Sequence, residues 1–321
     1  MLTEVLYLVV AFVVTAILGK IIIPVLKKLK VGQSERLDGP RSHLKKKGTP
    51  TMGGIMMIIT ILLLSIIVSI INHDLAKVIL PVALVSIGFG LVGFIDDFKK
   101  VVLKNTDGLS PKLKLLGQLV VSVVFVLFLL NYTDLGTVIK IPFTEFTLEL
   151  PTFIYIPLMI LVMLGTTNAV NLTDGVDGLA GSVSAIIIAA FSIIAFRSGI
   201  YGISIFGAIC SGACVGFLIY NFHKAKVMMG DTGSLLLGGV ISSIAIYLQN
   251  PLLLIIIAII PVIETLSVIA QVVSFSLFGK RIIKMAPLHH HFELSGWREN
   301  RVVGVFSFIT LIASIIGILA V

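Results

Sequence analysis

Five aspartates are the residues best suited to chemistry, because each lies where a long apolar stretch begins or ends. They are Asp96, Asp97, Asp174, Asp177 and Asp231, out of 16 acidic residues in the chain. Adjacent carboxylates such as Asp96 and Asp97 repel each other at such an edge unless a cation or lysines compensate their charge. Mg²⁺ prefers oxygen ligands and commonly bridges substrate phosphates. We therefore expect these aspartates to form a magnesium site.

Amide side chains accompany one of these aspartates at regular spacing. Asn168, Asn171 and Asp174 follow one another at three-residue steps. They share one side of a helix if the helix continues through them. Gly175 and Gly178 then permit a tight turn and a close approach of a ligand to the backbone.

Asp231 also has a plainer interpretation, because it lies in a Gly-Asp-Thr-Gly-Ser sequence typical of a helix start. Asp or Thr at this position often caps the helix by accepting a hydrogen bond from a backbone N–H group. Its shared position with the four other aspartates favours the metal role over a cap alone.

Three consecutive histidines, His289, His290 and His291, belong to an internal Pro-Leu-His-His-His-Phe-Glu sequence. A zinc site would want spaced ligands with supporting partners, and consecutive histidines rarely turn all their rings to one ion. Imidazoles that bind phosphate or position the aspartates are favoured instead. A purely structural role in the loop is the other alternative.

The segment before the second apolar stretch is basic and rich in glycine. Lys46 lies within a run of three lysines, and Thr51, Gly53 and Gly54 follow at the expected start of a helix. Free backbone N–H groups and a hydroxyl at a helix start suit an anion. The lysines could also serve only to orient the chain in a membrane. The segment is not a Walker loop, because it has no Gly-Lys-Ser/Thr ending.

Composition places all of these residues in an integral membrane protein. Of the 321 residues, 57% are hydrophobic and only 12% are charged, too few to cover a water-soluble core of this size. Apolar stretches close to the roughly 20 residues that cross a bilayer recur along the whole chain. We expect a single all-α domain, residues 1–321, with about ten transmembrane helices. The expected helices are 2–26, 52–72, 78–95, 113–130, 152–167, 179–196, 200–220, 233–248, 251–278 and 302–320.

Basic residues indicate which ends of these helices face the cytoplasm. Alternate loops hold all but four of the 24 Lys and Arg residues; the exceptions are Lys20, Lys77, Lys140 and Arg197. Such an excess is typical of cytoplasmic loops. We therefore expect both termini outside and the five aspartates at the cytoplasmic face.

Two further features depart from a plain membrane-spanning helix. The segment 131–150 alternates apolar and polar residues, which predicts a small outer β-hairpin. The ninth helix, 251–278, exceeds one bilayer crossing and contains Pro261, so we expect it to bend. It also contains Glu264, for which a structural hydrogen-bonding role is favoured over catalysis.

Taken together, these motifs closely resemble one enzyme family. The motifs are Gly48-Thr-Pro-Thr-Met-Gly-Gly54, Gly93-Phe-Ile-Asp-Asp97, the segment 168–178, Met229-Gly-Asp-Thr-Gly-Ser234 and Pro287-Leu-His-His-His-Phe-Glu293. Their order and spacing resemble those of the bacterial phospho-N-acetylmuramoyl-pentapeptide transferases, in the superfamily of polyprenyl-phosphate phospho-sugar transferases. The resemblance covers nearly the whole chain.

The resemblance implies a Mg²⁺-dependent enzyme of the bacterial cell membrane with its active site on the cytoplasmic face. Such enzymes transfer phospho-N-acetylmuramoyl-pentapeptide from UDP-N-acetylmuramoyl-pentapeptide to undecaprenyl phosphate and release UMP. The product, undecaprenyl-pyrophosphoryl-N-acetylmuramoyl-pentapeptide (lipid I), is the first lipid-linked intermediate of peptidoglycan synthesis. No nucleic acid partner is implied, and a homodimer is left open.

The resemblance also assigns expected roles to individual residues. Asp231 is the principal metal ligand, with Asp96, Asp97 and Asp174 as further candidates, and Asp96 prepares the lipid phosphate as a base or positioner. The expected catalytic residues are Asp96, Asp97, Asn171, Asp174, Asp231 and His290. The expected substrate-binding residues are Lys46, Thr51, Lys112, Lys114, Asn168, Gly175, Asp177, Asn221, Met228, His289 and His291.

Met228 departs from the family pattern, because members often carry Phe at this position of the nucleoside pocket. Methionine is apolar but cannot stack as a ring does. The uridine site is retained as an expectation, whereas its contacts in detail are not.

Three alternative functions are considered beside this expected transferase. One differs in its substrate, and two belong to other classes of protein. A related transferase would use UDP-N-acetylglucosamine for a different glycan. A transporter would line an ion path with polar residues near broken helices, although no clear repeat of such breaks occurs in two halves of the chain. A scaffold protein would leave the shared position of the five aspartates unexplained. Direct attack by the lipid phosphate and a two-step route through a covalent aspartate both stay open.

Overall fold

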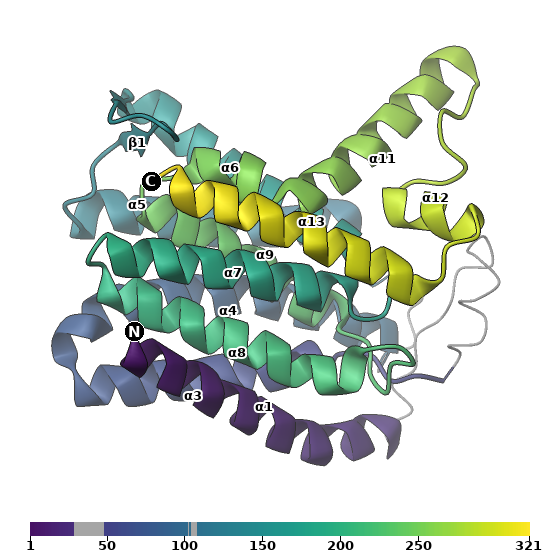
Figure 1. Cartoon of the computed structure of the whole chain (residues 1–321), viewed down its shortest axis with the longest axis horizontal. Helices are drawn as coiled ribbons and strands as arrows, with labels where there is room; N and C mark the ends of the chain where they lie inside the picture. The colour runs from purple at the N-terminus through teal and green to yellow at the C-terminus, as the bar shows by residue number, and fades with distance from the viewer. Residues whose placement is uncertain (29–47, 102, 104–107) are drawn as a thin grey trace.

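The computed structural model describes residues 1–28, 48–101, 103 and 108–321. These residues form a helical bundle with one small sheet (Figure 1). The elements are α1 (Leu2–Lys28), α3 (Gly54–Ile71), α4 (His73–Val101), α5 (Pro111–Tyr132), β1 (Val138–Lys140), β2 (Thr147–Glu149), α6 (Thr152–Thr173), α7 (Leu179–Arg197), α8 (Tyr201–Asn221), α9 (Gly230–Tyr247), η1 (Pro251–Leu253), α10 (Leu254–Ile257), α11 (Ile259–Phe278), α12 (Leu288–Leu294) and α13 (Glu299–Leu319). The expected all-α architecture is confirmed.

Among the described residues, nine helices are long and apolar enough to cross a bilayer: α1, α3, α4, α5, α6, α7, α8, α11 and α13. The eighth expected helix, 233–248, forms α9, which is not in that set. Its first five residues include Asp231, Thr232 and Ser234, and the rest of the helix is mostly apolar and buried. The chain is therefore a multi-pass membrane protein in which α9 is enclosed by the other helices.

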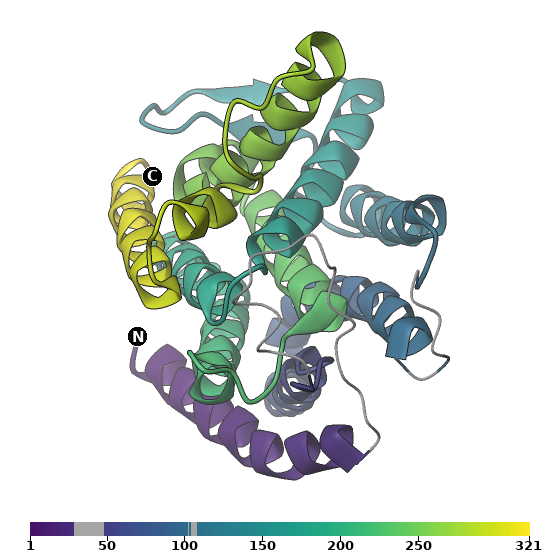
Figure 2. The ribbon, with the colours of Figure 1, turned by 90° about the vertical axis from the view of Figure 1, so that its right-hand side faces the viewer.

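Small residues allow the other helices to pack closely around α9. Its residues from Thr232 to Tyr247 are all buried. Gly238 and Gly239 lie so near Thr167 and Phe89 that an added methyl group would come within 2.4 and 2.8 Å of them. Small residues at such contacts are typical of helix packing in membranes. Figure 2 looks along the bundle and shows α9, in green, with helices on every side of it.

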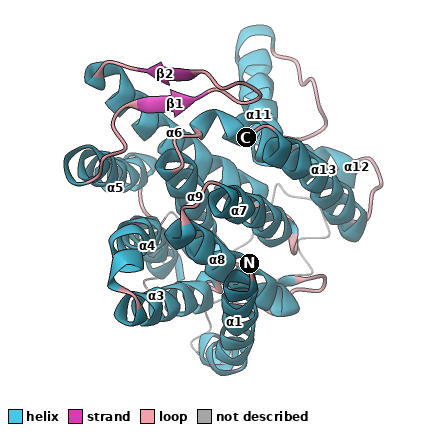
Figure 3. Ribbon diagram, turned by 60° about the vertical axis from the view of Figure 1, so that its left-hand side comes forward, coloured by secondary structure: helices cyan, strands magenta, loops and turns pink. Residues whose placement is uncertain are grey.

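Both termini lie at the same end of the bundle, together with the β-hairpin (Figures 1 and 3). The hairpin pairs β1 with β2 antiparallel, with Ile139 opposite Leu148. The backbone N–H of Phe143 donates to the carbonyl oxygen of Ala320 at 2.8 Å, so the hairpin contacts the C-terminal residues. The predictions of a hairpin and of termini on one face are confirmed, whereas the side of the membrane stays a prediction.

The ninth predicted helix is interrupted, as expected from its length and its proline. It divides into η1, α10 and α11, with Ala258 between the last two at φ −94° and ψ 33°. Pro261 has no N–H group to donate to the carbonyl of Ile257, so the helix is weakened at this point. Beyond the break, α11 leans away from the bundle and leads through residues 279–287 to α12 (Figure 1).

Candidate active site

Glycines allow the ends of α4 and α9 to touch at the candidate site. A methyl group at Gly93 of α4 would lie 2.0 Å from the carbonyl oxygen of Asp231. On the neighbouring side, a methyl group at Gly54 of α3 would lie 2.2 Å from the backbone nitrogen of Gly233. Side chains larger than hydrogen cannot fit these contacts. The close approach therefore places Asp96 and Asp97 of α4 beside Asp231 of α9.

The carboxylates of Asp96, Asp97 and Asp231 form one group, with an oxygen from each lying within 4.8 Å of the others. Asp96 and Asp97 are buried, whereas Asp231 is partly exposed. Oδ1 of Asp96 accepts a hydrogen bond from the backbone N–H of Leu109 at 2.7 Å. We refer to these three residues as the acid cluster.

Asp97 caps the start of α9 from a different helix. Its Oδ1 accepts from the backbone N–H of Asp231 at 3.2 Å. Its Oδ2 accepts from the backbone N–H of Thr232 at 2.9 Å and from the Thr232 hydroxyl at 2.6 Å. A helix start has backbone N–H groups without partners in the helix, which such acceptors satisfy. The sequence left open that Asp231 itself caps this helix. Asp97 supplies the cap instead, so the side chain of Asp231 can point into the acid cluster.

Two lysines neutralise most of the charge of the acid cluster. Nζ of Lys100 lies 2.5 Å from Oδ2 of Asp96 and 3.0 Å from Oδ2 of Asp231. Nζ of Lys114 lies 2.9 Å from the same oxygen of Asp231. Lys114 was predicted at the phosphates, whereas Lys100 was missed. Its spacing of four residues from Asp96 on one helix was the available signal.

The amides of α6 are divided between two partners. Nδ2 of Asn171 donates to Oδ1 of Asp231 at 2.7 Å and to the Ser234 hydroxyl at 2.8 Å. Nδ2 of Asn168, one turn earlier, donates to Oε1 of Gln118 at 2.8 Å. Asn171 therefore belongs to the acid cluster's surroundings, and Asn168 joins α6 to α5 through a fully buried glutamine that the sequence analysis did not identify.

Asp174 and Gly175 lie in the turn after α6. Asp174 is the residue at which α6 ends, and its backbone N–H donates to the carbonyl of Asn171 at 3.2 Å. It is not one of the three residues whose oxygens form the acid cluster. Its predicted roles in catalysis and metal binding stay predictions.

Asp177 and Asn221 tie this turn to the loop between α8 and α9. Oδ1 of Asn221 accepts from the backbone N–H of Gly178 at 3.0 Å, and its Nδ2 donates to the carbonyl of Val227 at 2.9 Å. Oδ2 of Asp177 accepts from the backbone N–H of Ala225 at 3.0 Å. The same carboxylate lies 3.7 Å from Nδ1 of His223. Both predicted substrate-binding residues thus hold the loop that leads to Asp231.

The glycine-rich segment before α3 lies along residues 228–230. The N–H of Met228 donates to the carbonyl of Pro50, and the N–H groups of Gly53 and Gly54 donate to Met228 and Met229 at 2.9 and 3.0 Å. The expectation that these glycine N–H groups are free to bind an anion was therefore wrong, because the chain itself satisfies them. Thr51 is buried beside Gly230, where a methyl group would lie 2.8 Å from its hydroxyl.

Three further predicted substrate-binding residues are Lys46, Lys112 and Met228. Lys46 lies outside the described residues. Lys112 is exposed near the start of α5, two residues before Lys114. Met228 is partly exposed at the contact with Pro50. Their roles in substrate binding stay predictions.

The three histidines form the start of α12 and have different partners. Nδ1 of His290 lies 2.8 Å from Oε2 of Glu293. Nδ1 of His291 accepts a hydrogen bond from the backbone N–H of Lys284 at 3.2 Å, so this nitrogen carries no proton. His289 is fully buried and lies 3.2 Å from Oε1 of Glu264. Within the described ranges, no group of potential metal ligands includes any of the three.

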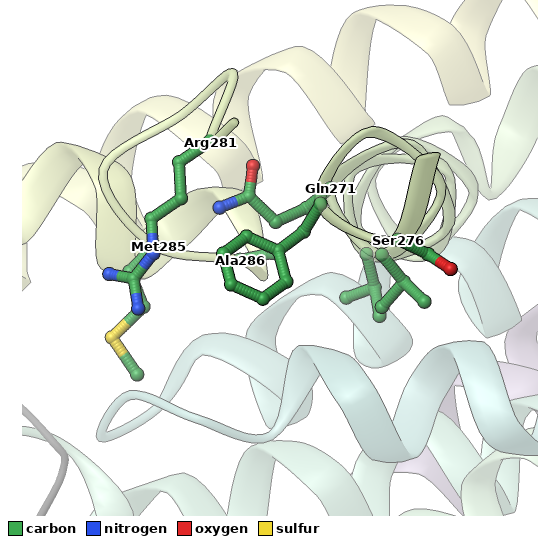
Figure 4. A pocket seen from close by; sticks show the side chains of 8 residues that line it. Gln271, Ser276, Arg281, Met285 and Ala286 are labelled. Atoms are coloured by element: carbon green, nitrogen blue, oxygen red, sulfur yellow. The ribbon is translucent and has the colours of Figure 1, made fainter. Parts of the chain in front are cut away.

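A cavity of about 630 Å³ lies between α11 and the segment that returns to α12. Figure 4 shows Gln271 and Ser276 on α11, with Arg281, Met285 and Ala286 on the returning segment. The other lining residues are Val268, Val272 and Phe275, and none of the predicted site residues is among them. The acid cluster is therefore separate from this cavity.

The acid cluster fits a magnesium ion by the chemistry of its donors. Three carboxylates against two ammonium groups leave one excess negative charge. Oδ2 of Asp96 is buried and, apart from its ion pair with Lys100, makes no hydrogen bond to the described residues. Such hard oxygen donors match the preference of Mg²⁺, which also uses few carboxylates. Asp96 and Asp231 are the residues best placed to hold it, because both oxygens of Asp97 bind the start of α9.

Comparisons with known proteins show the family of the chain. Residues 78–249 match the family model described as "Glycosyl transferase family 4". The chain is 52% identical over 311 residues to the phospho-N-acetylmuramoyl-pentapeptide-transferase of Halalkalibacterium halodurans, covering 97% of this chain and 95% of the relative. Proteins of the same name from Staphylococcus carnosus and Bacillus subtilis are 48% and 47% identical, covering 97% and 96% of this chain and 97% and 94% of their own length. The chain therefore belongs to glycosyl transferase family 4 and, within it, to the phospho-N-acetylmuramoyl-pentapeptide-transferases.

Proposed function

We propose that this chain is a Mg²⁺-dependent enzyme that transfers phospho-N-acetylmuramoyl-pentapeptide from UDP-N-acetylmuramoyl-pentapeptide to undecaprenyl phosphate. The products are lipid I and UMP. The observation that carries the proposal is the acid cluster with its two lysines, in a chain about half identical to transferases of that name. Donor and acceptor are both phosphates, so catalysis must bring two anions together and align them.

The reaction forms one P–O bond and breaks another. An oxygen of undecaprenyl phosphate attacks the phosphorus that carries the sugar. The bond from that phosphorus to the oxygen bridging the two phosphates of the donor breaks, and UMP leaves with the electron pair. The acceptor phosphate is already ionised near neutral pH, so this direct attack requires little base catalysis.

The chain's own residues supply charge and position to this reaction. Lys100 and Lys114 present ammonium groups at Asp231, where phosphate oxygens can replace the carboxylate as partners. Asn171 orients Asp231 through the hydrogen bond to its Oδ1. Mg²⁺ held by Asp231 and Asp96 would supply the positive charge that draws the two phosphates together. Asp97 keeps the start of α9, and therefore Asp231, in place.

We place the acid cluster at the cytoplasmic face of the bacterial cell membrane. The described lysines at this end, Lys100, Lys112 and Lys114, agree with the positive charge of cytoplasmic loops. A soluble nucleotide sugar would reach the site from the cytoplasm, and the lipid phosphate would reach it from the bilayer. The homodimer stays a prediction, which light scattering of the detergent-solubilised protein tests.

The direct test is synthesis of lipid I by the purified protein. The protein is incubated with Mg²⁺, undecaprenyl phosphate and radiolabelled UDP-N-acetylmuramoyl-pentapeptide, and the lipid is then extracted. We expect labelled lipid and UMP in equal amounts, and neither after chelation of the metal. Label transferred only from UDP-N-acetylglucosamine, or no labelled lipid at all, would overturn the proposal. Rapid quenching that traps a phosphorylated aspartate would instead favour the two-step route.

A further inference from the structure

Glu264 is a carboxyl group buried in α11 that contacts a different helix. Its side chain has no exposed surface in the described structure. Oε2 accepts a hydrogen bond from the backbone N–H of Leu288 at 2.6 Å, and Oε1 accepts from the backbone N–H of His289 at 3.1 Å. Both donors lie in the first turn of α12, where the backbone N–H groups have no partners within the helix. Glu264 therefore holds the start of the histidine helix to α11.

The same carboxylate also faces the ring of His289. Nδ1 of His289 lies 3.2 Å from Oε1 of Glu264, and the ring is fully buried. Neither ring nitrogen of His289 makes a hydrogen bond to the described residues, so the ring lies against the carboxylate without a hydrogen bond to it. Nε2 lies on the side of Gly175.

Gly175 makes room for this ring. A methyl group at Gly175 would lie 2.1 Å from Nε2 of His289. Gly175 directly follows Asp174, and α6 carries Asn171, which binds Asp231. The contact thus connects α11, through His289, to the turn beside the acid cluster.

The two following histidines have partners that Glu264 does not supply. Nδ1 of His290 lies by Glu293 of the same helix, and Nδ1 of His291 accepts from the backbone of Lys284. Their rings are oriented within α12 and its preceding segment. Phe292 of α12 packs on Phe306 of α13, and the contacts of Glu264 and His289 hold the first turn of the helix.

We propose that Glu264 is a positioning residue for the transfer reaction. It fixes α12 and the ring of His289 against the turn at Gly175, and so sets the place of His290 and His291, the residues predicted to act on the phosphates, relative to the acid cluster. Glu264 itself touches no substrate. The inference deepens the proposed function and rests on it.

The test compares two substitutions of Glu264 with a control on the same helix. Glu264→Gln keeps the shape but replaces one acceptor oxygen with a donor, so only one of the two N–H groups of α12 is satisfied. Glu264→Ala removes both acceptors. Thr265→Val is the control, because the Thr265 hydroxyl donates to the carbonyl of Pro261 within α11 and, among the described residues, to no group of α12.

We expect kcat to fall about 10-fold in Glu264→Gln and about 100-fold in Glu264→Ala, with KM for the nucleotide changed less than threefold. Thr265→Val should match the unsubstituted protein. A rise in KM for the nucleotide as large as the fall in kcat would overturn the proposal. An unchanged kcat in Glu264→Gln would overturn it as well.

A second measurement does not depend on turnover. Solid-state ¹⁵N NMR of histidine-labelled protein identifies the signal of His289 as the one lost in His289→Gln. We expect the ring ¹⁵N signals of His289 to differ between the unsubstituted protein and Glu264→Gln, because the ring lies against this carboxylate. Signals of His289 that do not move would contradict the positioning role even in folded, active protein. Failure to make lipid I by the unsubstituted protein, with this shift of the His289 signals present, would instead count against the proposed function alone.

Discussion

The acid cluster and the histidine helix are held in place in different ways. The acid cluster lies where α3, α4 and α9 touch through glycines, and together its carboxylates have partners on α4, α5, α6 and α9. The histidine helix has seven residues and follows α11, which leans away from the bundle. Glu264 holds its first turn through two hydrogen bonds.

This difference indicates separate functions for the two regions. Close backbone contact makes the acid cluster rigid, which suits a site that must hold a metal ion and two phosphates at fixed distances. The histidine helix is held by side-chain contacts instead, from Glu264 at its first turn and from Phe292 to Phe306 of α13. Substitutions should therefore damage the two regions in different ways: added volume should destabilise the fold at the acid cluster, and loss of an acceptor at the histidine helix should slow the reaction.

The largest expected effect is the loss of activity in Asp231→Asn. Removing the charge of the principal metal ligand should lower kcat about 10³-fold, which corresponds to a rise of about 4 kcal/mol in the activation free energy. The reason is that the phosphates lose the charge that draws them together. Synthesis of lipid I measures it. Asp74→Asn is the matched control, because Asp74 pairs with Lys77 at the other end of α4. Activity within 10-fold of the unsubstituted protein would remove Asp231 from the metal site.

A smaller loss is expected in Lys100→Met. The substitution leaves Asp96 and Asp231 without their shared ammonium group, so kcat should fall about 100-fold as one phosphate partner is lost. The affinity for Mn²⁺ should rise at the same time, because the metal no longer competes with the lysine for these carboxylates. Lys77→Met should change neither quantity. Weaker Mn²⁺ binding in Lys100→Met would show that the lysine supports the metal site and does not compete for it.

The contacts between helices predict a loss of stability in Gly93→Ala. The added methyl group would overlap the carbonyl of Asp231, so the free energy of unfolding should fall by about 1–3 kcal/mol. Thermal unfolding in detergent measures the change.

The control for this substitution gives the smallest effect. Gly304→Ala lies on α13, where an added methyl group meets nothing within 4 Å. It should leave stability unchanged or raise it by up to about 1 kcal/mol, because alanine favours a helix more than glycine does. Equal losses in both variants would mean that close contact at Gly93 is not what holds the acid cluster.

The sequence predicted the membrane helices well, because the bilayer imposes a length and an apolar composition that are readable locally. The ends were less well predicted at α4, which begins at His73 and continues to Val101, beyond the expected 78–95. The charged residues Asp96, Asp97, Lys99 and Lys100 interrupt the apolar pattern while the helix itself continues. That continuation is what brings Lys100 onto the same side as Asp96.

The residue types of the site were also predictable, whereas most partners were not. Lys100 and Asp231 are 131 positions apart, and no local pattern indicates that they meet. The N–H groups of Gly53 and Gly54 were expected to bind an anion, but the carbonyls of Met228 and Met229, far along the chain, accept them. Partners of this kind depend on how the helices pack.

Binding of Mn²⁺, followed by electron paramagnetic resonance, tests the central claim most directly. The purified chain should bind one ion per molecule with Asp96 and Asp231 intact, and Asp231→Asn should abolish that binding in folded protein. Binding of one ion with unchanged affinity in Asp231→Asn would contradict a metal centre built by α4 and α9.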